Sequence, residues 1–409
     1  MPSPSSIVPR RVVVVGGGIA ALEALLALSD LGDGRLDLTL VAPNESFVLS
    51  PMTVAVPFSA GHATEVPLAD VCARFDADLH RAPVVQVDPE SRLVRCADGV
   101  EVSYDALIVA TGARAVAAYR SALTFFAEDP VAINGLLHDI DQGYCESVAV
   151  VVPRSGSWAL PAYELALMIA REAADAGISD MPVHLVTPEP AAMAIFGPAG
   201  STAVQQLLDD AGVQLHTDAF ASVGRGGRIT MMPGERRLQV ARVLALPRLE
   251  GRRIDGLPID ERGFVPIDEH ARVVGLDDVY AAGDGTDFPI KQGGLATQQA
   301  DAAARHIAAR AGAPVDPEPF RPVLRGMLLT GGRPRFLRNE PAGGRGEGTV
   351  DDRSLWWPPV KVVGRYLSPW LAGEEGLAPK PVPEDERVEI EVPLRHDRES
   401  DPLALLARP

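Results

Sequence analysis

The stretch RVVVVGGGIAALEALLAL, residues 11–28, constrains the fold of this chain more than any other. Four consecutive valines predict a short buried strand, and the three glycines after them predict a tight turn. Ala and Leu then recur at helical spacing, and LDLTLVAP at 36–43 alternates as a second strand would. Together these segments predict a βαβ unit of the size found in Rossmann folds.

Gly16, Gly18 and Ala21 satisfy the pattern G-x-G-x-x-G/A where the strand gives way to the helix. Gly16 permits the tight turn, Gly18 lets a diphosphate approach the backbone, and Ala21 lets helix and strand pack closely. The helix N-terminus then faces the phosphate charge, so the pattern predicts a nucleotide site. Ala42 stands where an acid usually binds the ribose, and the displaced candidates for that role are Asn44 and Glu45.

A second βαβ pattern starts at residue 148, with the strand VAVVV, the helix YELALMIAREAADAG and the strand VHLVTPEP. Its turn is longer than the first, begins with Pro153, which has no N–H, and keeps only Gly156 of the glycine set. Thr187 occupies the position where an acid would bind the ribose of NAD. NAD(P)H binding is therefore disfavoured, although a looser nicotinamide mode stays open.

Two later stretches, YDALIVATGA at 104–113 and VYAAGDGTDFP at 279–289, resemble signatures of the pyridine nucleotide-disulphide oxidoreductase superfamily. Members of this superfamily are flavoproteins with two dinucleotide-binding domains. The resemblance implies that the first Rossmann unit holds FAD, and we expect it to be held noncovalently because no His or Cys is placed to suggest covalent attachment. It also implies that Asp284 accepts hydrogen bonds from the ribityl hydroxyls, and that further cofactor contacts come from Thr111, Gly112 and Gly283.

Within that superfamily, PAYELA, TDFPIKQGGLATQQAD and WWPPVKVVGRYLSPWLA resemble the branch of sulphide:quinone oxidoreductases and flavocytochrome-c-type sulphide dehydrogenases. The resemblance implies that the helix after KQGG points at the flavin ring, with Gly294 and Leu295 near its pyrimidine edge. Lys291 would stabilise negative charge on the reduced flavin, unless it is a solvated surface lysine. Glu164 would relay a proton near the flavin, unless it is only a first-turn glutamate favoured by the helix dipole.

The thiols that this branch uses are missing. Ser157 or Trp158 stands at or beside the first catalytic cysteine position, and the chain has no cysteine after Cys145. Thiol-based sulphide oxidation is therefore rejected. The three cysteines form no CxxC pair, so they predict neither a redox disulfide nor a metal site, and we expect buried thiols in a reducing cytoplasm.

The formal charge of −17 argues against nucleic-acid binding and against electrostatic docking on anionic membranes. No stretch is long and apolar enough to predict a spanning helix, so the expected location is cytoplasmic with at most peripheral membrane contact. The aromatic segment 355–371 could roof a quinone pocket, lie in a membrane interface, pack the C-terminal region or form a homodimer contact. RVEIEVPL at 387–394 predicts a late edge strand.

We therefore expect an α/β protein with two Rossmann-like, glutathione-reductase-like dinucleotide-binding domains and a C-terminal interface region. The expected boundaries are 8–115 with 255–312 for the FAD domain, 116–254 for the second domain and 313–409 for the interface region. The expected function is FAD-dependent two-electron transfer from a small reduced donor to a quinone-like or other small acceptor. The alternatives are an NAD(P)H:acceptor reductase with an atypical nicotinamide pocket and a redox-inert FAD-binding interaction protein.

Overall fold

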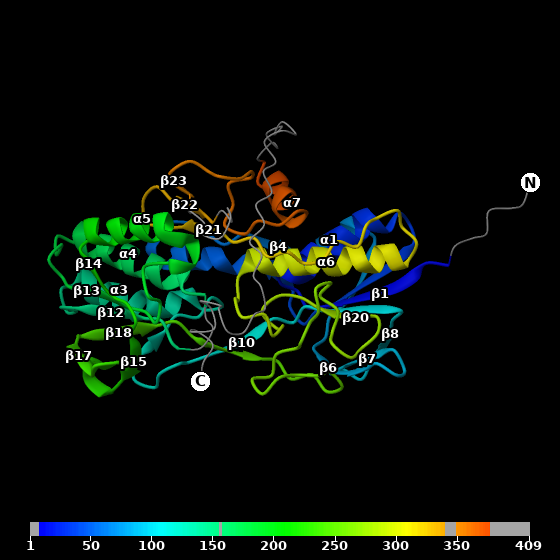
Figure 1. Ribbon diagram of the computed structural model, residues 1–409, viewed down its shortest axis with the longest axis horizontal. Coiled ribbons are helices and arrows are strands. Elements are labelled where there is room, and N and C mark those ends of the chain that lie inside the picture. The colour runs from blue at the N-terminus through cyan, green and yellow to red at the C-terminus, as the bar shows by residue number, and fades with distance from the viewer. Residues whose placement is uncertain (1–7, 155–157, 340–348, 377–409) are drawn as a thin grey trace, which may run out of the picture.

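A computed structural model of the 409-residue chain describes residues 8–154, 158–339 and 349–376. Two lobes lie side by side along the long axis, and each is built on a parallel sheet with helices packed on it (Figure 1). The predicted α/β class with two Rossmann-like units is confirmed. The expected domain boundaries stay a prediction, and the strand expected at 387–394 lies outside the described residues.

The first sheet has five parallel strands in the order β20-β9-β1-β2-β5. Its strands are β20 (Val279–Ala281), β9 (Ala106–Val109), β1 (Arg10–Val15), β2 (Leu36–Val41) and β5 (Ala77–His80). Its helices are α1 (Ile19–Gly32), α2 (Leu68–Arg74) and α6 (Gly293–Arg310). The order reverses at β1, and ligands of open α/β sheets bind outside the carboxyl ends of the strands at such a point.

The second sheet repeats this arrangement in the order β11-β18-β12-β13-β14. Its strands are β11 (Leu123–Thr124), β18 (Arg242–Ala245), β12 (Val148–Val151), β13 (Val183–Val186) and β14 (Val213–His216). Its helices are α3 (Asn134–Asp141), α4 (Leu160–Asp175) and α5 (Gly197–Asp210). Strands β12 and β13 are wholly buried, which explains why they contain hardly any polar residue.

Smaller antiparallel sheets surround these two cores. They comprise β3 (Ser46–Val48) with β4 (Glu65–Pro67); β6 (Val84–Asp88), β7 (Leu93–Cys96) and β8 (Glu101–Ser103); β10 (Ala113–Val116) with β19 (Arg248–Gly251); β15 (Phe220–Val223), β16 (Arg228–Met232) and β17 (Arg236–Gln239); and β21 (Arg325–Leu328), β22 (Arg335–Arg338) and β23 (Thr349–Asp351). The remaining elements are helix α7 (Leu367–Glu374) and the 3-10 turns η1 (Ser50–Phe58), η2 (Pro130–Ile133), η3 (Ala194–Phe196) and η4 (Arg225–Gly227).

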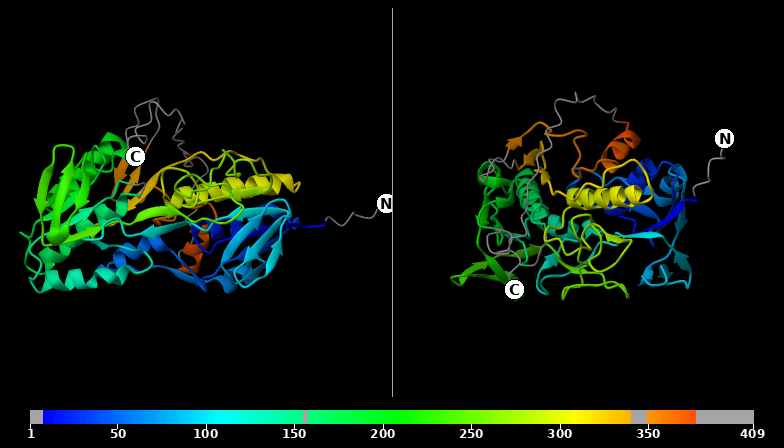
Figure 2. Two further views of the ribbon diagram at one scale, coloured as in Figure 1. Left: turned by 90° about the horizontal axis from the view of Figure 1, so that it is seen from below. Right: turned by 45° about the vertical axis from the view of Figure 1, so that its right-hand side comes forward.

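The C-terminal strands and helix α7 reach from α4 and α5 across to α1 (orange in Figures 1 and 2). One buried carboxylate attaches this segment to the first lobe. Glu23 on α1 is fully buried and accepts the backbone N–H groups of Arg365, Tyr366 and Leu367 at 2.7, 3.1 and 2.8 Å. Burial raises the pKa of Glu23 to about 7, which these three hydrogen bonds partly oppose.

The aromatic residues of this segment pack against neighbouring elements. Trp356 stands edge-on to Phe336 with ring centroids 5.2 Å apart, and its indole N–H donates to the Val360 carbonyl oxygen at 2.9 Å. Trp370 stands edge-on to Phe75 at 6.1 Å. Of the functions expected for 355–371, the structure therefore supports packing, while Trp357 stays 38% exposed.

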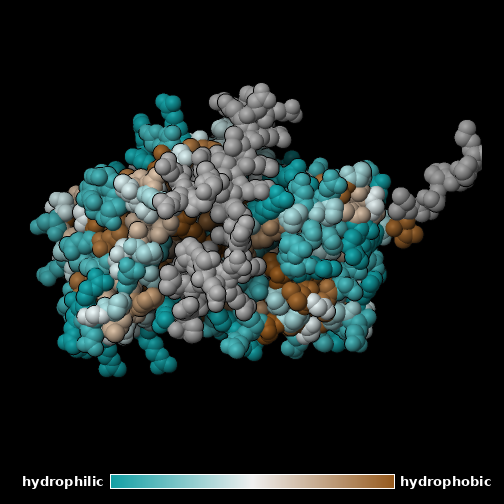
Figure 3. All heavy atoms as spheres, viewed as in Figure 1, coloured by the Kyte–Doolittle hydropathy of each residue, from teal (hydrophilic) through white to brown (hydrophobic). Residues whose placement is uncertain are grey.

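Hydrophilic residues dominate the margins of the face in Figure 3, and hydrophobic residues lie nearer its middle. Within the described ranges, none of the helices is both long and apolar enough to cross a bilayer.

Replacing Glu23 with leucine should lower the free energy of unfolding by about 3 kcal/mol, because three backbone amides lose their shared acceptor. Hydrogen exchange of the amides at 365–367 should accelerate in the same variant. The matched control is Glu45→Leu, since the Glu45 side chain is 78% exposed. Unchanged protection at 365–367 in Glu23→Leu would show that this carboxylate does not attach the segment.

Candidate functional site

The turn between β1 and α1 can be made only by glycine at its first position. Gly16 has a φ of +128°, and a Cβ there would lie 2.2 Å from the carbonyl oxygen of Ala110. Its N–H donates to the Val41 carbonyl oxygen at 2.8 Å. The end of β1 is therefore pressed against the ends of both neighbouring strands, β9 and β2.

Gly18 has a different reason to be glycine. It is the exposed N-cap of α1, and a Cβ built on it would meet no protein atom within 4 Å. Protein packing therefore does not demand glycine here, whereas a diphosphate drawn close to the backbone at a helix N-terminus would. Ala21, one turn into the helix, is fully buried in the first core.

Two further segments meet this turn. A Cβ on Gly285 would lie 3.1 Å from the Gly112 carbonyl oxygen, and Thr111 follows directly on the carbonyl that Gly16 touches. Gly283 has a φ of +86°, and a Cβ there would lie 3.2 Å from that of Ala20 on α1. The structure thus brings together three segments that are about 90 to 270 residues apart in sequence, as expected for parts of one dinucleotide site.

Asp284 is partly exposed beside this turn, and its carboxylate makes no hydrogen bond to any residue that the structure describes. Desolvation raises its pKa, and the positive charge of Lys291 partly opposes that shift. A half-buried carboxylate without a protein donor is costly unless a ligand supplies one. It therefore fits the hydroxyl groups of a ribityl chain.

Lys291 is buried, with 7% of its surface exposed, so the solvated-lysine alternative is wrong. Its Nζ donates to the Thr286 carbonyl oxygen and lies 3.9 Å from the centroid of the Phe264 ring. Burial lowers the pKa of Lys291 to about 8, although Asp284 and Asp287 raise it in part. The lysine is thus held as a weakly solvated cation in front of helix α6.

The N-terminus of α6 follows directly. Gln292 caps it, because its side-chain oxygen accepts the N–H of Leu295 at 2.9 Å. Leu295 and Gly294 are buried, and among the described residues the N–H groups of Gly293 and Gly294 find no acceptor. Two free amides and a neighbouring cation make this helix end electropositive.

Glu164 lies elsewhere in its helix than the sequence suggested. Helix α4 begins at Leu160, not at Tyr163, so Glu164 is beyond the first turn and the helix-dipole explanation is wrong. Its buried carboxylate accepts Lys361 Nζ at 2.6 and 2.7 Å and the N–H of Leu329 at 2.9 Å. Burial raises the pKa of Glu164 and lowers that of Lys361. The two pKa values therefore approach each other, which makes a proton easier to exchange between the groups.

This ion pair joins the second lobe to the start of α6. Lys361 precedes Val362, and a Cβ on Gly293 would lie only 2.9 Å from Val362 Cγ2. The Oγ1 of Thr297, on the first turns of α6, donates to the Val363 carbonyl oxygen at 2.9 Å. Lys361 of the ion pair is therefore the chain neighbour of Val362, which packs against the electropositive N-terminus of α6.

The second βα turn is only partly described, since residues 155–157 lie outside the described ranges. Trp158 packs edge-on against Phe196, with ring centroids 6.0 Å apart, in the second core. The acid nearest the expected NAD ribose position, Glu189, faces inward and accepts the hydroxyls of Tyr163 at 2.7 Å and Thr187 at 2.9 Å. A ribose would have to break this buried network to reach it.

Sequence reasoning missed two features near the site. Glu23 lies within the apolar helix that the sequence predicts, and a lone acid among AALEALLAL is the kind of signal that marks a buried carboxylate with partners. The partner of Glu164 was not foreseen, because Lys361 is 197 residues further along the chain. No local pattern predicts such a contact.

The two parallel sheets, the glycine turn and the convergent segments define a two-dinucleotide-domain flavoprotein. The chain belongs to the pyridine nucleotide-disulphide oxidoreductase family, whose pattern it matches over residues 10–306. It is thus an FAD-dependent oxidoreductase, and the predicted superfamily and cofactor are confirmed.

Individual relatives differ in the activity that their names give. An NADH dehydrogenase-like protein of Mycobacterium tuberculosis is 27% identical over 293 residues, 67% of this chain and 72% of its own. The sulfide-quinone reductase of Aquifex aeolicus is 27% identical over 222 residues, 52% of this chain and 51% of its own.

Solved structures agree on the fold. The sulfide:quinone oxidoreductase of Aquifex aeolicus superposes with a TM-score of 0.74 at 19% identity, covering 84% of this chain and 87% of that one. The putidaredoxin reductase–putidaredoxin complex gives a TM-score of 0.58 at 17% identity, with 85% and 88% covered.

The inward carboxylate of Glu189 generates a pH prediction. Burial raises its pKa to about 7, so the folded state holds a proton that the unfolded chain releases at lower pH. The stability it contributes is complete below the unfolded pKa of about 4.3 and is lost as pH rises through about 7.

Glu189→Gln has no titratable group at this position. Between pH 5 and pH 8, the free energy of unfolding of the parent protein should therefore fall by up to about 3 kcal/mol relative to that of Glu189→Gln. Denaturant unfolding at the two pH values measures the difference. Glu146→Gln, at an exposed position in the same lobe, is the control. Parallel pH profiles for Glu189→Gln and the parent protein would contradict the raised pKa.

Proposed function

We propose that this protein transfers two electrons from a small reduced donor to a quinone-like or other small acceptor, without thiol chemistry. The observation that carries the proposal is the buried Glu164–Lys361 ion pair beside the N-terminus of α6. Quinone reduction consumes protons as well as electrons, and an acid and a base of converging pKa can supply and replace them.

The other parts of the site have separate tasks. Bound FAD supplies reversible two-electron chemistry. The turn at Gly16 and Gly18 presents backbone amides to its diphosphate, and Asp284 accepts hydrogen bonds from its ribityl hydroxyls. Lys291 and the free amides of α6 favour negative charge at the flavin ring.

Thiol-based oxidation of sulphide is excluded from the proposal on the positions of the three cysteines. Cys72, Cys96 and Cys145 are all buried and unpaired. Cys145 precedes β12, whereas the longer turn follows that strand, and burial raises the thiol pKa of Cys145, which disfavours the nucleophilic thiolate. Buried free thiols also support a reducing, cytoplasmic location.

The NAD(P)H:acceptor reductase is a second candidate. The similarity to an NADH dehydrogenase-like protein favours it. The inward-facing Glu189 and the proline at the start of the second turn oppose it.

Anaerobic stopped-flow mixing with NADH, NADPH and sulphide separates these functions through the rate at which the flavin colour is lost. If the proposal holds, NADH and NADPH bleach the flavin slowly or not at all, and sulphide does not bleach it. Fast bleaching by a nucleotide favours the reductase, and fast bleaching by sulphide refutes the exclusion of that chemistry.

The double variant Glu164→Gln/Lys361→Met removes both charges together, so that neither is left buried without its partner. After chemical reduction, its reoxidation by a water-soluble short-chain quinone should be about 100-fold slower than that of the parent protein. Flavin content should be unchanged. Arg353→Gln, exposed in the same segment, is the control, and equal reoxidation rates would exclude the ion pair from the reaction.

Lys291→Met should lower the two-electron midpoint potential of the flavin by about 30 mV or more, since a nearby positive charge is lost. The parent protein should also show an extra fall in potential above about pH 8, where Lys291 loses its proton, and the variant should not. A spectroelectrochemical titration with Arg333→Gln as control measures both effects. Identical potentials at every pH would mean that Lys291 does not act on the flavin.

A further inference from the structure

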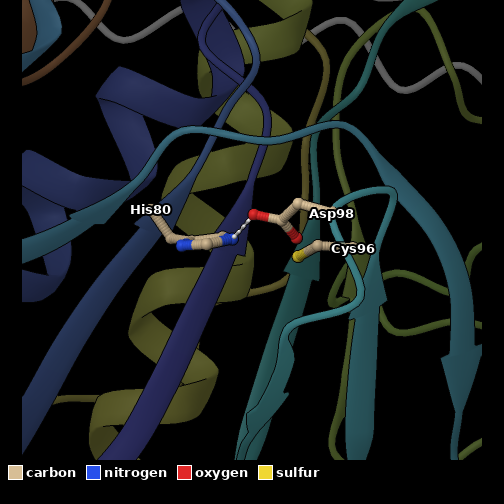
Figure 4. Close-up of side chains that lie close together, drawn as sticks. All are labelled: His80, Cys96 and Asp98. Carbon is tan, nitrogen blue, oxygen red and sulfur yellow. Dashed lines mark ion pairs between the residues drawn. The ribbon is translucent and has the colours of Figure 1, made fainter.

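Three side chains of ligand type lie close together in the first lobe, and none of them has a part in the proposed electron transfer. His80 ends β5, Cys96 ends β7, and Asp98 follows two residues later in the turn to β8. One ligand atom from each lies within 4.8 Å of the others (Figure 4). In Figure 4 the imidazole of His80 comes from β5, and the thiol of Cys96 and the carboxylate of Asp98 come from the hairpin that β7 begins.

The backbone around these residues is well fixed. The His80 carbonyl oxygen accepts the N–H of Ala42 at 3.1 Å, which places β5 against β2. The N–H of Cys96 donates to the Val100 carbonyl oxygen at 2.9 Å, and that of Gly99 donates to Cys96 at 3.0 Å. Two ligand candidates therefore stand on a tight hairpin turn and the third on the neighbouring sheet.

The hydrogen bonding leaves capacity unused. One oxygen of Asp98 accepts the N–H of Val100 at 3.1 Å, while the other lies 3.1 Å from His80 Nε2. That oxygen is out of line for a hydrogen bond, so the buried Nε2 atom is unsatisfied among the described residues. A buried ring nitrogen without a hydrogen bond, close to a thiol and a carboxylate, provides three ligand atoms that a metal cation could bind.

We propose that His80, Cys96 and Asp98 bind a divalent transition-metal ion of the zinc type, with water at the fourth position. A neutral imidazole, a thiolate and a carboxylate carry two negative charges, which balance the ion. Binding forms the metal–sulphur bond and releases the Cys96 thiol proton to solvent. Zinc bond lengths of about 2.0 to 2.3 Å require ligand atoms about 3.3 to 3.8 Å apart, so small side-chain rotations suffice.

The ion would tie the hairpin β7–β8 to β5, which is the edge strand of the first sheet. Its role is therefore to stabilise the lobe, and the inference does not depend on the proposed electron transfer. The competing explanation is a plain His80–Asp98 ion pair that needs no metal.

Calorimetric titration of zinc chloride into the chelator-treated, FAD-loaded full chain tests the proposal. We expect one zinc per chain with about one proton released, and a thiolate-to-metal absorption band when cobalt replaces zinc. Cys96→Ser should remove that band and weaken binding at least tenfold, and His80→Gln should weaken it similarly. Cys72→Ser, another buried cysteine of this lobe, should bind zinc normally.

Asp98→Asn provides a second test in case Cys96→Ser folds poorly. Asp98 is exposed, so its replacement should not disturb folding. It should also weaken zinc binding about tenfold, with flavin content unchanged. The proposal is overturned if zinc fails to bind at micromolar concentration, or if Asp98→Asn and His80→Gln bind it as the parent protein does.

Discussion

Strand β1 ends against the carbonyl oxygen of Ala110, and only a residue without a Cβ can stand there. This close approach at Gly16 brings the carboxyl ends of β1 and β9 together and starts α1 beside them. The segments around Gly112 and Gly283 can then pack against the same turn. The proposed cofactor site thus depends on one steric requirement at the point where the strand order reverses.

Two buried carboxylates attach the C-terminal segment to the two lobes beside that site. Glu23 collects three backbone amides of the C-terminal segment on the first lobe, and Glu164 holds the same segment from the second lobe through Lys361. Burying either carboxylate without its partners would be destabilising. The segment is therefore stable only in the position where both carboxylates find their partners. The segment therefore lies beside the N-terminus of α6, where the flavin chemistry is proposed.

The sequence predicted the fold because the fold rests on local patterns, and the cofactor site it predicts rests on patterns of the same kind. Valine runs, glycine turns and the order of three signatures are readable within short windows, and the family match confirms the class they indicated. The pairing of Glu164 with Lys361, the inward turn of Glu189 and the meeting of His80 with Cys96 are tertiary contacts. They depend on how distant elements pack, so no short window contains them. The position of helix α4 was also misjudged, since Leu160 and Pro161 begin the helix before the apolar pattern becomes regular.

The most direct test of this account is the ratio of FAD to protein in purified Gly18→Val beside the parent chain. A Cβ at this exposed N-cap would meet no protein atom within 4 Å, and its φ of −100° is open to residues other than glycine, so the fold should be retained. We expect one FAD per parent chain and a folded, colourless variant that stays colourless in excess FAD. A colourless parent chain, or a variant that keeps its full flavin, would contradict it.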